Sequence, residues 1–264
     1  MHLIFIRHAD PDYKNDSLTE KGFKEAEFLS ERVKNWGNVE KLFSSPYGRA
    51  LETAKAVSKG INKSVTILPY LKEFDHRICH PETKKVRGCW DWLPSDLKDT
   101  PELYDKNLWL KTDAMQSGNI SLHYKTLCEN FDETLSEYGY KRISPNDNVD
   151  PVGIYNCTAH ISEEEAKTDT HLLPFQKDID AKTLVFVCHL GSMFCCISHL
   201  LGISPVVLWQ GFFVAPSSVT VLSSQERVPG EAVFRVQTLG NVNHLSKNGE
   251  TPSASGFFGN FTDF

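Results

Sequence analysis

The sequence of 264 residues lacks features that define several large classes of protein. It has no uninterrupted apolar run of membrane-spanning length, because its most apolar stretch, residues 184–214, contains His189, His199 and Gln210. A transmembrane helix is therefore not expected. Runs of Lys and Arg are also missing, and the net charge is −6, whereas nucleic-acid-binding proteins favour clustered positive charge. We expect neither a membrane nor a nucleic acid as a partner.

The seven cysteines do not form the pattern of a disulfide framework. Their number is odd, their spacing is irregular, and no C-x-x-C pair occurs. This usage is typical of a reduced, intracellular protein rather than a secreted one. The first apolar run, residues 3–6, is too short for the apolar part of a signal peptide. We therefore expect a cytoplasmic location.

Short apolar runs alternate with amphipathic segments in the first part of the chain. Residues 1–6 form a continuous apolar run, which is typical of a strand buried on both faces of a parallel sheet, and residues 41–44 and 65–68 predict a second and a third strand. Residues 19–36 and 47–59 lie between them and place apolar side chains at helical spacing. This order predicts the α/β class, with three layers and a mostly parallel, doubly wound sheet.

The same pattern returns near the end of the chain. Residues 182–188 predict another buried strand, and residues 191–201 predict a helix that ends at Gly202. Residues 217–223 and 232–239 predict two last strands, joined as a hairpin.

The middle of the chain lacks this regularity and is rich in turn residues. We therefore predict a single domain, residues 1–264, whose core consists of residues 1–73 and 182–245, approximately. An insertion of about residues 74–181 would cover the site at the sheet edge. Residues 246–264, rich in Gly, Ser and Phe, would form a loose C-terminal tail.

Polar side chains follow four of the predicted strands. Arg7 and His8 follow the first strand, and Arg49 lies one turn into the helix after the second. Glu73 comes after the third strand, and His189 comes directly after the late strand. Because ligands of α/β sheets bind beyond the carboxyl ends of the strands, we expect these five side chains to meet at one edge.

Two guanidinium groups, two imidazoles and a carboxyl group have a coherent chemistry toward phosphate esters. Guanidinium groups bind phosphoryl oxygens in a bidentate manner. A neutral imidazole can attack phosphorus while a second one stabilises the phosphoryl oxygens. A carboxylic acid can protonate the leaving oxygen. Since the arginines can carry the charge, this chemistry requires neither a metal nor another cofactor.

The ordered set of motifs resembles the histidine phosphatase superfamily, the phosphoglycerate mutase-like group. Residues 3–8 (LIFIRH) are similar to its Arg-His strand end, and residues 44–54 (SSPYGRALETA) are similar to its second motif. Residues 18–22 resemble the start of its first helix. The V-x-V-C-H run that ends at His189 and residues 241–245 (NVNHL) resemble its closing segments. The resemblance covers residues 1–75 and 182–245, approximately.

This resemblance implies a role for each of the five side chains. His8 would be the nucleophile that becomes phosphorylated. Arg7 and Arg49 would bind the phosphoryl oxygens, with His189 beside them as a catalytic and phosphate-binding residue. Glu73 would protonate the leaving group and would later be the base that activates water.

Further residues are candidates for contact with the substrate or for the acid. Asp12, Thr19 and Ser45 lie in loops that could reach the substrate. Asp75 shares a loop with Glu73 and is the main rival for the role of proton donor.

The sequence departs from the family pattern at three places. Ala9 and Leu190 stand where the family usually has glycine after each histidine. The family's Gly-x-Trp-Glu-Gly stretch is missing, and residues 88–92 (GCWDW) are the candidate for a displaced counterpart of it. These departures concern the shape of the substrate pocket rather than the chemistry.

A metal site is the alternative for a second group of side chains. His76, Cys79, His80 and Cys89 are residue types that bind zinc. Their spacing fits none of the usual structural zinc patterns, so we predict no metal site.

The sequence thus predicts a metal-independent phosphomonoester hydrolase that forms a phosphohistidine and acts on a small-molecule phosphate ester. One alternative is a phosphoglycerate mutase-type phosphoryl transfer, although the basic closing tail of the mutases is not seen. The other is a non-catalytic protein that binds a phosphate ligand. The particular ester and the oligomeric state stay open.

Overall fold

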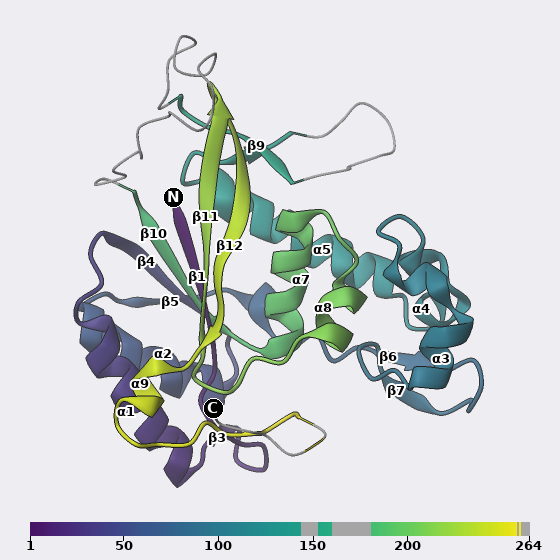
Figure 1. Ribbon diagram of the computed structural model, residues 1–264, viewed down its shortest axis with the longest axis horizontal. Coiled ribbons are helices and arrows are strands. Elements are labelled where there is room, and N and C mark those ends of the chain that lie inside the picture. The colour runs from purple at the N-terminus through teal and green to yellow at the C-terminus, as the bar shows by residue number, and fades with distance from the viewer. Residues whose placement is uncertain (144–152, 160–180, 258, 260–264) are drawn as a thin grey trace.

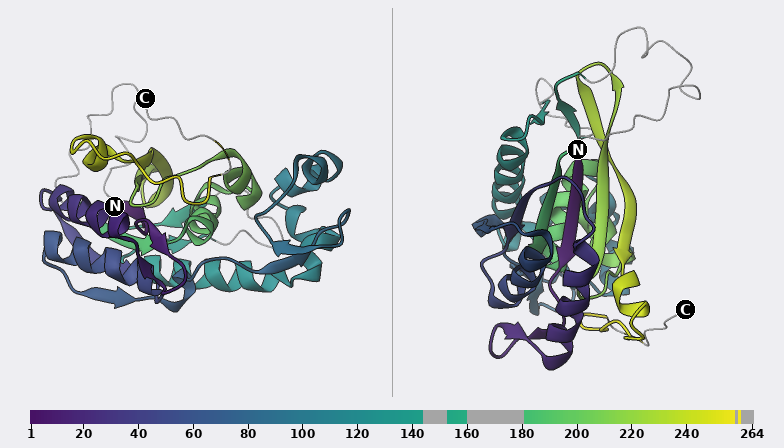
Figure 2. Two further views of the ribbon diagram at one scale, coloured as in Figure 1. Left: turned by 90° about the horizontal axis from the view of Figure 1, so that it is seen from below. Right: turned by 90° about the vertical axis from the view of Figure 1, so that its left-hand side faces the viewer.

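The computed structural model describes residues 1–143, 153–159, 181–257 and 259. A central mixed sheet lies between helices on both of its faces, as Figures 1 and 2 show. The three-layer α/β fold predicted from the sequence is confirmed. Within the described ranges, no helix combines the length and apolarity needed to cross a membrane.

The strands are β1 (His2–Arg7), β2 (Pro11–Asp12), β3 (Ser17–Leu18), β4 (Val39–Ser44), β5 (Val65–Ile67), β6 (Arg77–Cys79), β7 (Val86–Gly88), β8 (Lys141–Arg142), β9 (Ile154–Asn156), β10 (Thr183–Cys188), β11 (Val219–Val228) and β12 (Glu231–Asn241). The helices are α1 (Glu20–Val33), α2 (Gly48–Ile61), α3 (Pro94–Asp99), α4 (Asp113–Ser117), α5 (Ile120–Ser136), α7 (Leu190–Leu201), α8 (Pro205–Gly211) and α9 (Asn243–Ser246). Single 3₁₀ turns span Pro69–Leu71, Pro101–Tyr104 and Trp109–Lys111.

The order of strands in the central sheet is β5-β4-β10-β1-β11-β12-β9-β8. The first four are parallel, and the rest join by antiparallel pairing, which begins where β11 pairs with β1. Arg7 at the end of β1 is in register with Cys188 at the end of β10, and Val187 is in register with Ser44 of β4. The residues that follow these three strands therefore leave the sheet side by side.

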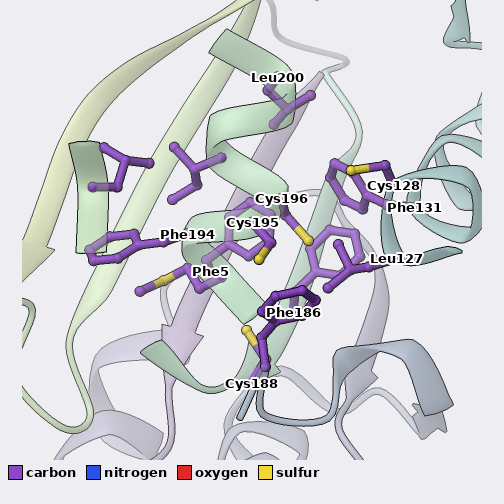
Figure 3. Close-up of a cluster of buried hydrophobic side chains, with 14 of the residues drawn as sticks. Phe5, Leu127, Cys128, Phe131, Phe186, Cys188, Phe194, Cys195, Cys196 and Leu200 are labelled. Atoms are coloured by element: carbon purple, nitrogen blue, oxygen red, sulfur yellow. The ribbon is translucent and has the colours of Figure 1, made fainter. Parts of the chain in front are cut away.

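Alternating side chains of β1 divide the core into two layers. Ile4 and Ile6 pack toward α1 and α2, whereas Leu3 and Phe5 point to the face covered by α5 and α7. Figure 3 shows the second layer, in which Phe5 stacks on Phe186 with ring centroids 5.1 Å apart. Complete burial of each such side chain contributes roughly 1.5–3 kcal/mol, so the sheet is held firmly from both sides.

Residues of the predicted insertion form three kinds of structure, of which the first is α5, packed on one face of the central sheet. A lobe beside α8 consists of β6, β7, α3 and α4 (Figure 1). The buried Trp109 of this lobe belongs to the same apolar cluster as Phe5. β8 and β9 instead extend the central sheet beyond β12.

The hairpin of β11 and β12 is longer than the sequence indicates. β11 continues to Val228 instead of ending at residue 223, because its polar second half still pairs with β12. The turn is correspondingly short and ends at Gly230, whose φ of 78° lies in the left-handed region that glycine adopts readily.

The structure describes residues 246–257 and 259 of the predicted C-terminal tail, and part of this segment packs against the rest of the domain. Pro252 and Ser253 are buried, and the chain around them lies along the N-terminal end of α1. Its contacts are an ion pair between Glu250 and Lys24, the Ser253 hydroxyl, the Ser255 carbonyl and the ring of Phe257, and composition does not reveal the partners of these groups. The prediction for residues 258 and 260–264 lies outside the described residues.

Candidate active site

The carboxyl edge of the parallel strands brings together five of the predicted site residues and Ser45. His8 and His189 follow neighbouring strands, and their ring centroids are 5.0 Å apart. Ser45 follows β4, and its Oγ lies 2.8 Å from Nε2 of His189. All three side chains are buried, as expected for groups at the centre of a site rather than on its rim.

The orientation of His8 is fixed by its neighbour in sequence. Its Nδ1 lies 2.8 Å from the carbonyl oxygen of Ala9. A carbonyl oxygen can only accept, so Nδ1 carries the proton and Nε2 keeps its lone pair. Burial, together with Arg7 and Arg49, lowers the pKa of His8 well below its ordinary value. A neutral imidazole with a free Nε2 has the form that a nucleophile requires.

His189 is held in a complementary way. The Ser45 hydroxyl accepts the backbone N–H of Tyr47 and lies against Nε2 of His189, which favours a proton on Nδ1. Burial, followed by the charges of His8 and Arg49, lowers the pKa of His189 well below its ordinary value. The ring is thus neutral and able to donate a hydrogen bond from Nδ1.

Arg7 is anchored by two backbone carbonyls. Its Nη1 donates to the oxygen of Val214 and its Nη2 donates to the oxygen of Ser255, each at 2.8 Å. The ring of Phe213 lies 5.6 Å from the guanidinium carbon. The guanidinium is therefore held in one plane, and its Nε is left for another partner.

Arg49 is fixed by an ion pair and two aromatic rings. Its Nη1 lies 2.8 Å from Oδ1 of Asp16, and the rings of Tyr47 and Tyr13 lie 4.9 Å and 5.4 Å from the guanidinium carbon. Asp16 also accepts the backbone N–H of Gly48 at the start of α2. Asp16 thus ties the β2–β3 loop to the helix that carries Arg49.

Three buried nitrogen atoms of this cluster have no hydrogen-bond partner among the described residues. They are Nε of Arg7, Nε of Arg49 and Nδ1 of His189. A buried donor without a partner costs about 1–3 kcal/mol. An oxyanion that accepts from these nitrogens would remove that cost, and a phosphoryl group has the charge and the oxygens to do so.

Glu73 lies beside the cluster with its carboxyl group against the first turn of α7. Its Oε1 accepts the backbone N–H groups of Phe74 at 2.8 Å and Ser192 at 3.2 Å. Burial raises the pKa of Glu73 even though these bonds and the two arginines act in the opposite direction. Asp75, the rival acid, is exposed. The burial of Glu73 thus favours the protonated form of its carboxyl group more than solvent would.

A β-carbon would be crowded at one position of this site, whereas two other positions accommodate a side chain without backbone strain. A β-carbon on Gly191 would lie 2.5 Å from Oε1 of Glu73. Ala9 and Leu190, which replace the usual glycines, do not have a positive φ, so their side chains cause no backbone strain. The N–H of Ala9 donates to Oγ1 of Thr53 and is not available to a ligand.

Two predicted substrate contacts lie elsewhere. Asp12 accepts from the backbone of Lys14 and Asn15 within the β2–β3 loop. Thr19 caps α1, because its Oγ1 accepts from Gly22 and donates to Asp10. Neither shows a contact with the histidine and arginine cluster in the part of the chain that the structure describes.

A pocket of about 390 Å³ opens next to Glu73. Tyr47 and Glu73 lie on its inner side, and the rings of His76 and His123 form a stacked pair with centroids 3.7 Å apart. The lining residues are Tyr47, Pro69, Tyr70, Lys72, Glu73, Phe74, Asp75, His76, Leu122, His123, Thr126 and Leu127. The pocket therefore extends from Glu73 toward α5.

The residues considered for zinc do not gather around a common point. Nδ1 of His80 lies 3.2 Å from Asp96, and the thiol of Cys89 is buried against the carbonyl of Phe74. Within the described ranges, no group of three or more His, Cys, Asp or Glu side chains is placed to hold a metal ion.

Several positioning groups were not found from the sequence. They are Asp16, Thr53, Ser192 and the carbonyl groups of Val214 and Ser255. Asp16 has a positive φ of 45°, and its Asn-Asp context signals a turn, but only the fold shows that this turn meets Arg49.

The fold and the buried cationic cluster at its carboxyl edge define an α/β protein whose site fits a phosphoryl group. Residues 3–104 match the histidine phosphatase superfamily (branch 1), which confirms the family resemblance predicted from the sequence.

One curated relative is the 2,3-bisphosphoglycerate-dependent phosphoglycerate mutase of Thermoplasma acidophilum, which is 30% identical over 95 residues. The match covers 32% of this chain and spans 44% of the length of that relative.

Solved structures with the same fold cover nearly the whole chain. The phosphoserine phosphatase of Entamoeba histolytica, in complex with 3-phosphoglyceric acid, aligns over 92% of this chain and 98% of its own. The identity is 18% and the TM-score is 0.53. A mycobacterial glucosyl-3-phosphoglycerate phosphatase aligns over 90% and 98%, with 16% identity and a TM-score of 0.51. At such identities the similarity shows the shared fold.

Proposed function

We propose that the protein hydrolyses a small phosphomonoester through a phosphohistidine at His8, without a metal. One observation carries this proposal: Nε2 of His8 keeps its lone pair beside two buried guanidinium groups whose Nε atoms have no described partner. In this proposal, Nε2 of His8 is the nucleophile, and the two guanidinium groups bind the phosphoryl oxygens.

In the first step, Nε2 of His8 attacks phosphorus. A P–N bond forms while the ester P–O bond breaks, and the leaving oxygen takes the proton of Glu73. The Ala9 carbonyl stabilises the positive charge that develops on the imidazole, because it accepts from Nδ1. Both hydrogen bonds described for the Glu73 carboxyl end on Oε1, so we assign the transferred proton to Oε2.

In the second step, the Glu73 carboxylate takes a proton from water. The water oxygen attacks phosphorus, the P–N bond breaks, and inorganic phosphate leaves. His8 and the protonated Glu73 are then restored. The N–H donors of Arg7, Arg49 and His189 stabilise the negative oxygens in both steps, which is the main requirement of phosphoryl transfer.

The pocket next to Glu73 is the place for the alcohol part of the ester. Its volume of about 390 Å³ is within the range of small-molecule sites. Lys72 and Asp75 supply one charge of each sign, and the imidazole pair of His76 and His123 supplies a flat wall. We infer that this part of the chain, which lies largely outside the family motifs, determines the substrate.

All seven cysteines are free, and their usage supports the expected cytoplasmic location. The free energy that a disulfide framework would contribute is supplied by the two apolar layers of the core.

The test is release of inorganic phosphate from a panel of phosphate esters in the presence of EDTA. Wild-type protein should release phosphate, and His8→Ala should lose at least about 10³-fold in kcat. His199→Ala is the matched control, because His199 lies at the far end of α7 and hydrogen-bonds there to Asp132 of α5.

Equal hydrolysis by wild type and His8→Ala would overturn the mechanism. A mutase would place an acid-labile phosphate on His8 and convert phosphoglycerates without free phosphate. A protein that only binds the ligand would show binding without label or turnover.

A further inference from the structure

The chain returns to the site after α9. Nζ of Lys24 on α1 lies 2.5 Å from Oε2 of Glu250. Ser253, which is buried, donates from Oγ to Oδ1 of Asp10. Residues 250–257, named the strap below, thus follow the N-terminal end of α1 toward the carboxyl edge of the sheet (Figures 1 and 2).

The far half of the strap contacts Arg7 itself. The carbonyl oxygen of Ser255 accepts from Nη2 of Arg7 at 2.8 Å. Gly256 comes so close that a β-carbon there would lie 3.1 Å from the same nitrogen. The ring of Phe257 packs on that of Phe213, with centroids 4.9 Å apart. The strap therefore covers one edge of the guanidinium.

Asp10, which anchors the strap through Ser253, is itself fixed by hydrogen bonds to α1 and its cap. Asp10 receives the Ser253 hydroxyl on Oδ1 and the Thr19 hydroxyl on Oδ2. Its backbone N–H donates to Oε2 of the buried Glu25 at 3.0 Å. Thr19 in turn caps α1. The strap is thus fixed to a rigid helix end, and the position of Ser255 follows from that attachment.

We propose that the strap is a positioning device for the phosphate-binding Arg7. Without the Ser255 carbonyl, Arg7 would keep the bond to the Val214 carbonyl, the contact with the Phe213 ring and its interaction with Tyr13, but its guanidinium would be freer to rotate. The second carbonyl, from Ser255, fixes its plane and directs the free Nε toward the phosphoryl site. Prearrangement of this kind reduces the ordering cost of binding. The proposal rests on the proposed function, because it takes Arg7 as a phosphoryl ligand.

Full-length variants test the strap with inorganic phosphate as the probe and calorimetric titration as the measurement. Ser253→Ala removes the bond to Asp10 and should raise the Kd of phosphate about tenfold, because a hydrogen bond that orients a charged group is disturbed. KM for p-nitrophenyl phosphate should rise in parallel, and Ser253→Thr, which keeps the hydroxyl, should restore binding. Ser246→Ala, at an exposed serine of α9, is the matched control.

A double-mutant cycle shows whether the strap acts through Arg7. Arg7→Met keeps the apolar stem and should weaken phosphate binding more than Ser253→Ala does. In the Arg7→Met background, Ser253→Ala should have no further effect. Circular dichroism and thermal unfolding verify that each variant is folded.

Gly256→Val is a second perturbation that leaves the anchor in place. Gly256 has a φ of 87°, and a side chain there would push against Arg7, so the Ser255 carbonyl must move. The variant should weaken phosphate binding, and this effect should also vanish in the Arg7→Met background.

The outcomes separate the two proposals. If Arg7→Met binds phosphate as wild type does, the phosphoryl role of Arg7 is wrong. If Arg7→Met binds phosphate weakly but Ser253→Ala and Gly256→Val bind it as wild type does, the strap proposal is wrong and the proposed function stands. The same conclusion follows if the effects of Ser253→Ala and Gly256→Val on the Kd add to that of Arg7→Met. Tighter binding by Ser253→Ala would also overturn the strap proposal, because the strap would then obstruct the site.

Discussion

A β-carbon at Gly191 would lie 2.5 Å from Oε1 of Glu73, so the carboxyl group rests directly on the backbone of α7. Gly191→Ala should displace the carboxyl group and lower kcat for an alkyl phosphate by about 10–100-fold, because the acid no longer meets the leaving oxygen. Steady-state kinetics measures this effect. The stability should fall by about 1–3 kcal/mol, as in other overpacked cores.

Gly211→Ala is the control for that substitution. Gly211 is also helical, but no heavy atom lies within 4 Å of the point that its β-carbon would occupy. This variant should keep its kcat. An unchanged kcat in Gly191→Ala would mean that the carboxyl group is not held against α7 during the reaction.

The dependence of activity on the leaving group identifies the residue that acts as the acid. Glu73→Gln cannot donate a proton, so alkyl phosphates, whose alkoxide leaves poorly, should lose about 10²–10⁴-fold in kcat. p-Nitrophenyl phosphate should lose much less in the phosphorylation step, since nitrophenolate leaves unprotonated. Burst kinetics separates this step from dephosphorylation. Asp75→Asn is the matched control and should keep both activities within a few-fold.

The pH profile provides the second part of this check. Burial raises the pKa of Glu73, so its acid form persists to higher pH than that of a free carboxyl group. For alkyl phosphates, kcat/KM should fall as the pH rises through that raised pKa, and Glu73→Gln should lack this fall. His8 has a lowered pKa and stays neutral in mildly acidic solution. If Asp75→Asn lost activity on alkyl phosphates and the fall of kcat/KM with pH, while Glu73→Gln kept both, the acid would be Asp75.

A carboxyl group under the strap anchor makes the stability depend on pH. Burial raises the pKa of Glu25 from 4.5 to about 7, so the folded protein holds this proton more tightly than the unfolded chain. The contribution is complete below pH 4.5 and is lost as the pH rises through about 7, with a size on the order of 3 kcal/mol. Glu25→Gln, which can still accept from Asp10, should abolish this loss.

Urea unfolding at pH 5.5 and pH 8.5 measures the difference for each protein. The exposed Glu27 on the same helix provides the control Glu27→Gln, which should behave as wild type. Parallel pH dependence in wild type and Glu25→Gln would show that the Glu25 proton does not contribute to stability.

The sequence was sufficient for the central part of the site because parallel strands align their ends. Arg7, His8 and His189 directly follow apolar runs, and the register of β1 with β10 then brings them together. The sequence also predicts Glu73 at this edge, but the difference in burial between Glu73 and Asp75 appears only when α7 packs on Glu73, and the identity of the acid stays a prediction.

The remaining parts depend on contacts that residue types do not encode. The Ser255 carbonyl could belong to any residue, so nothing in the sequence marks it as a partner of Arg7. Asp12 and Thr19 were assigned to the substrate by their place in a loop. In the structure both satisfy backbone groups, which is the common use of such side chains in turns and helix caps, and their contact with a substrate stays a prediction.

The strand order determines when the sheet can form as the chain is synthesised. β1 lies between β10 and β11, and β4 also reaches β1 only through β10. Residues 3–104, which carry the family match, therefore cannot join β1 to β4 on their own. His8, which follows β1, and Arg49, in the helix after β4, come together only after β10 has been synthesised and has inserted between these two strands. Such distant pairing folds slowly, and β1 has an unpaired apolar edge until then.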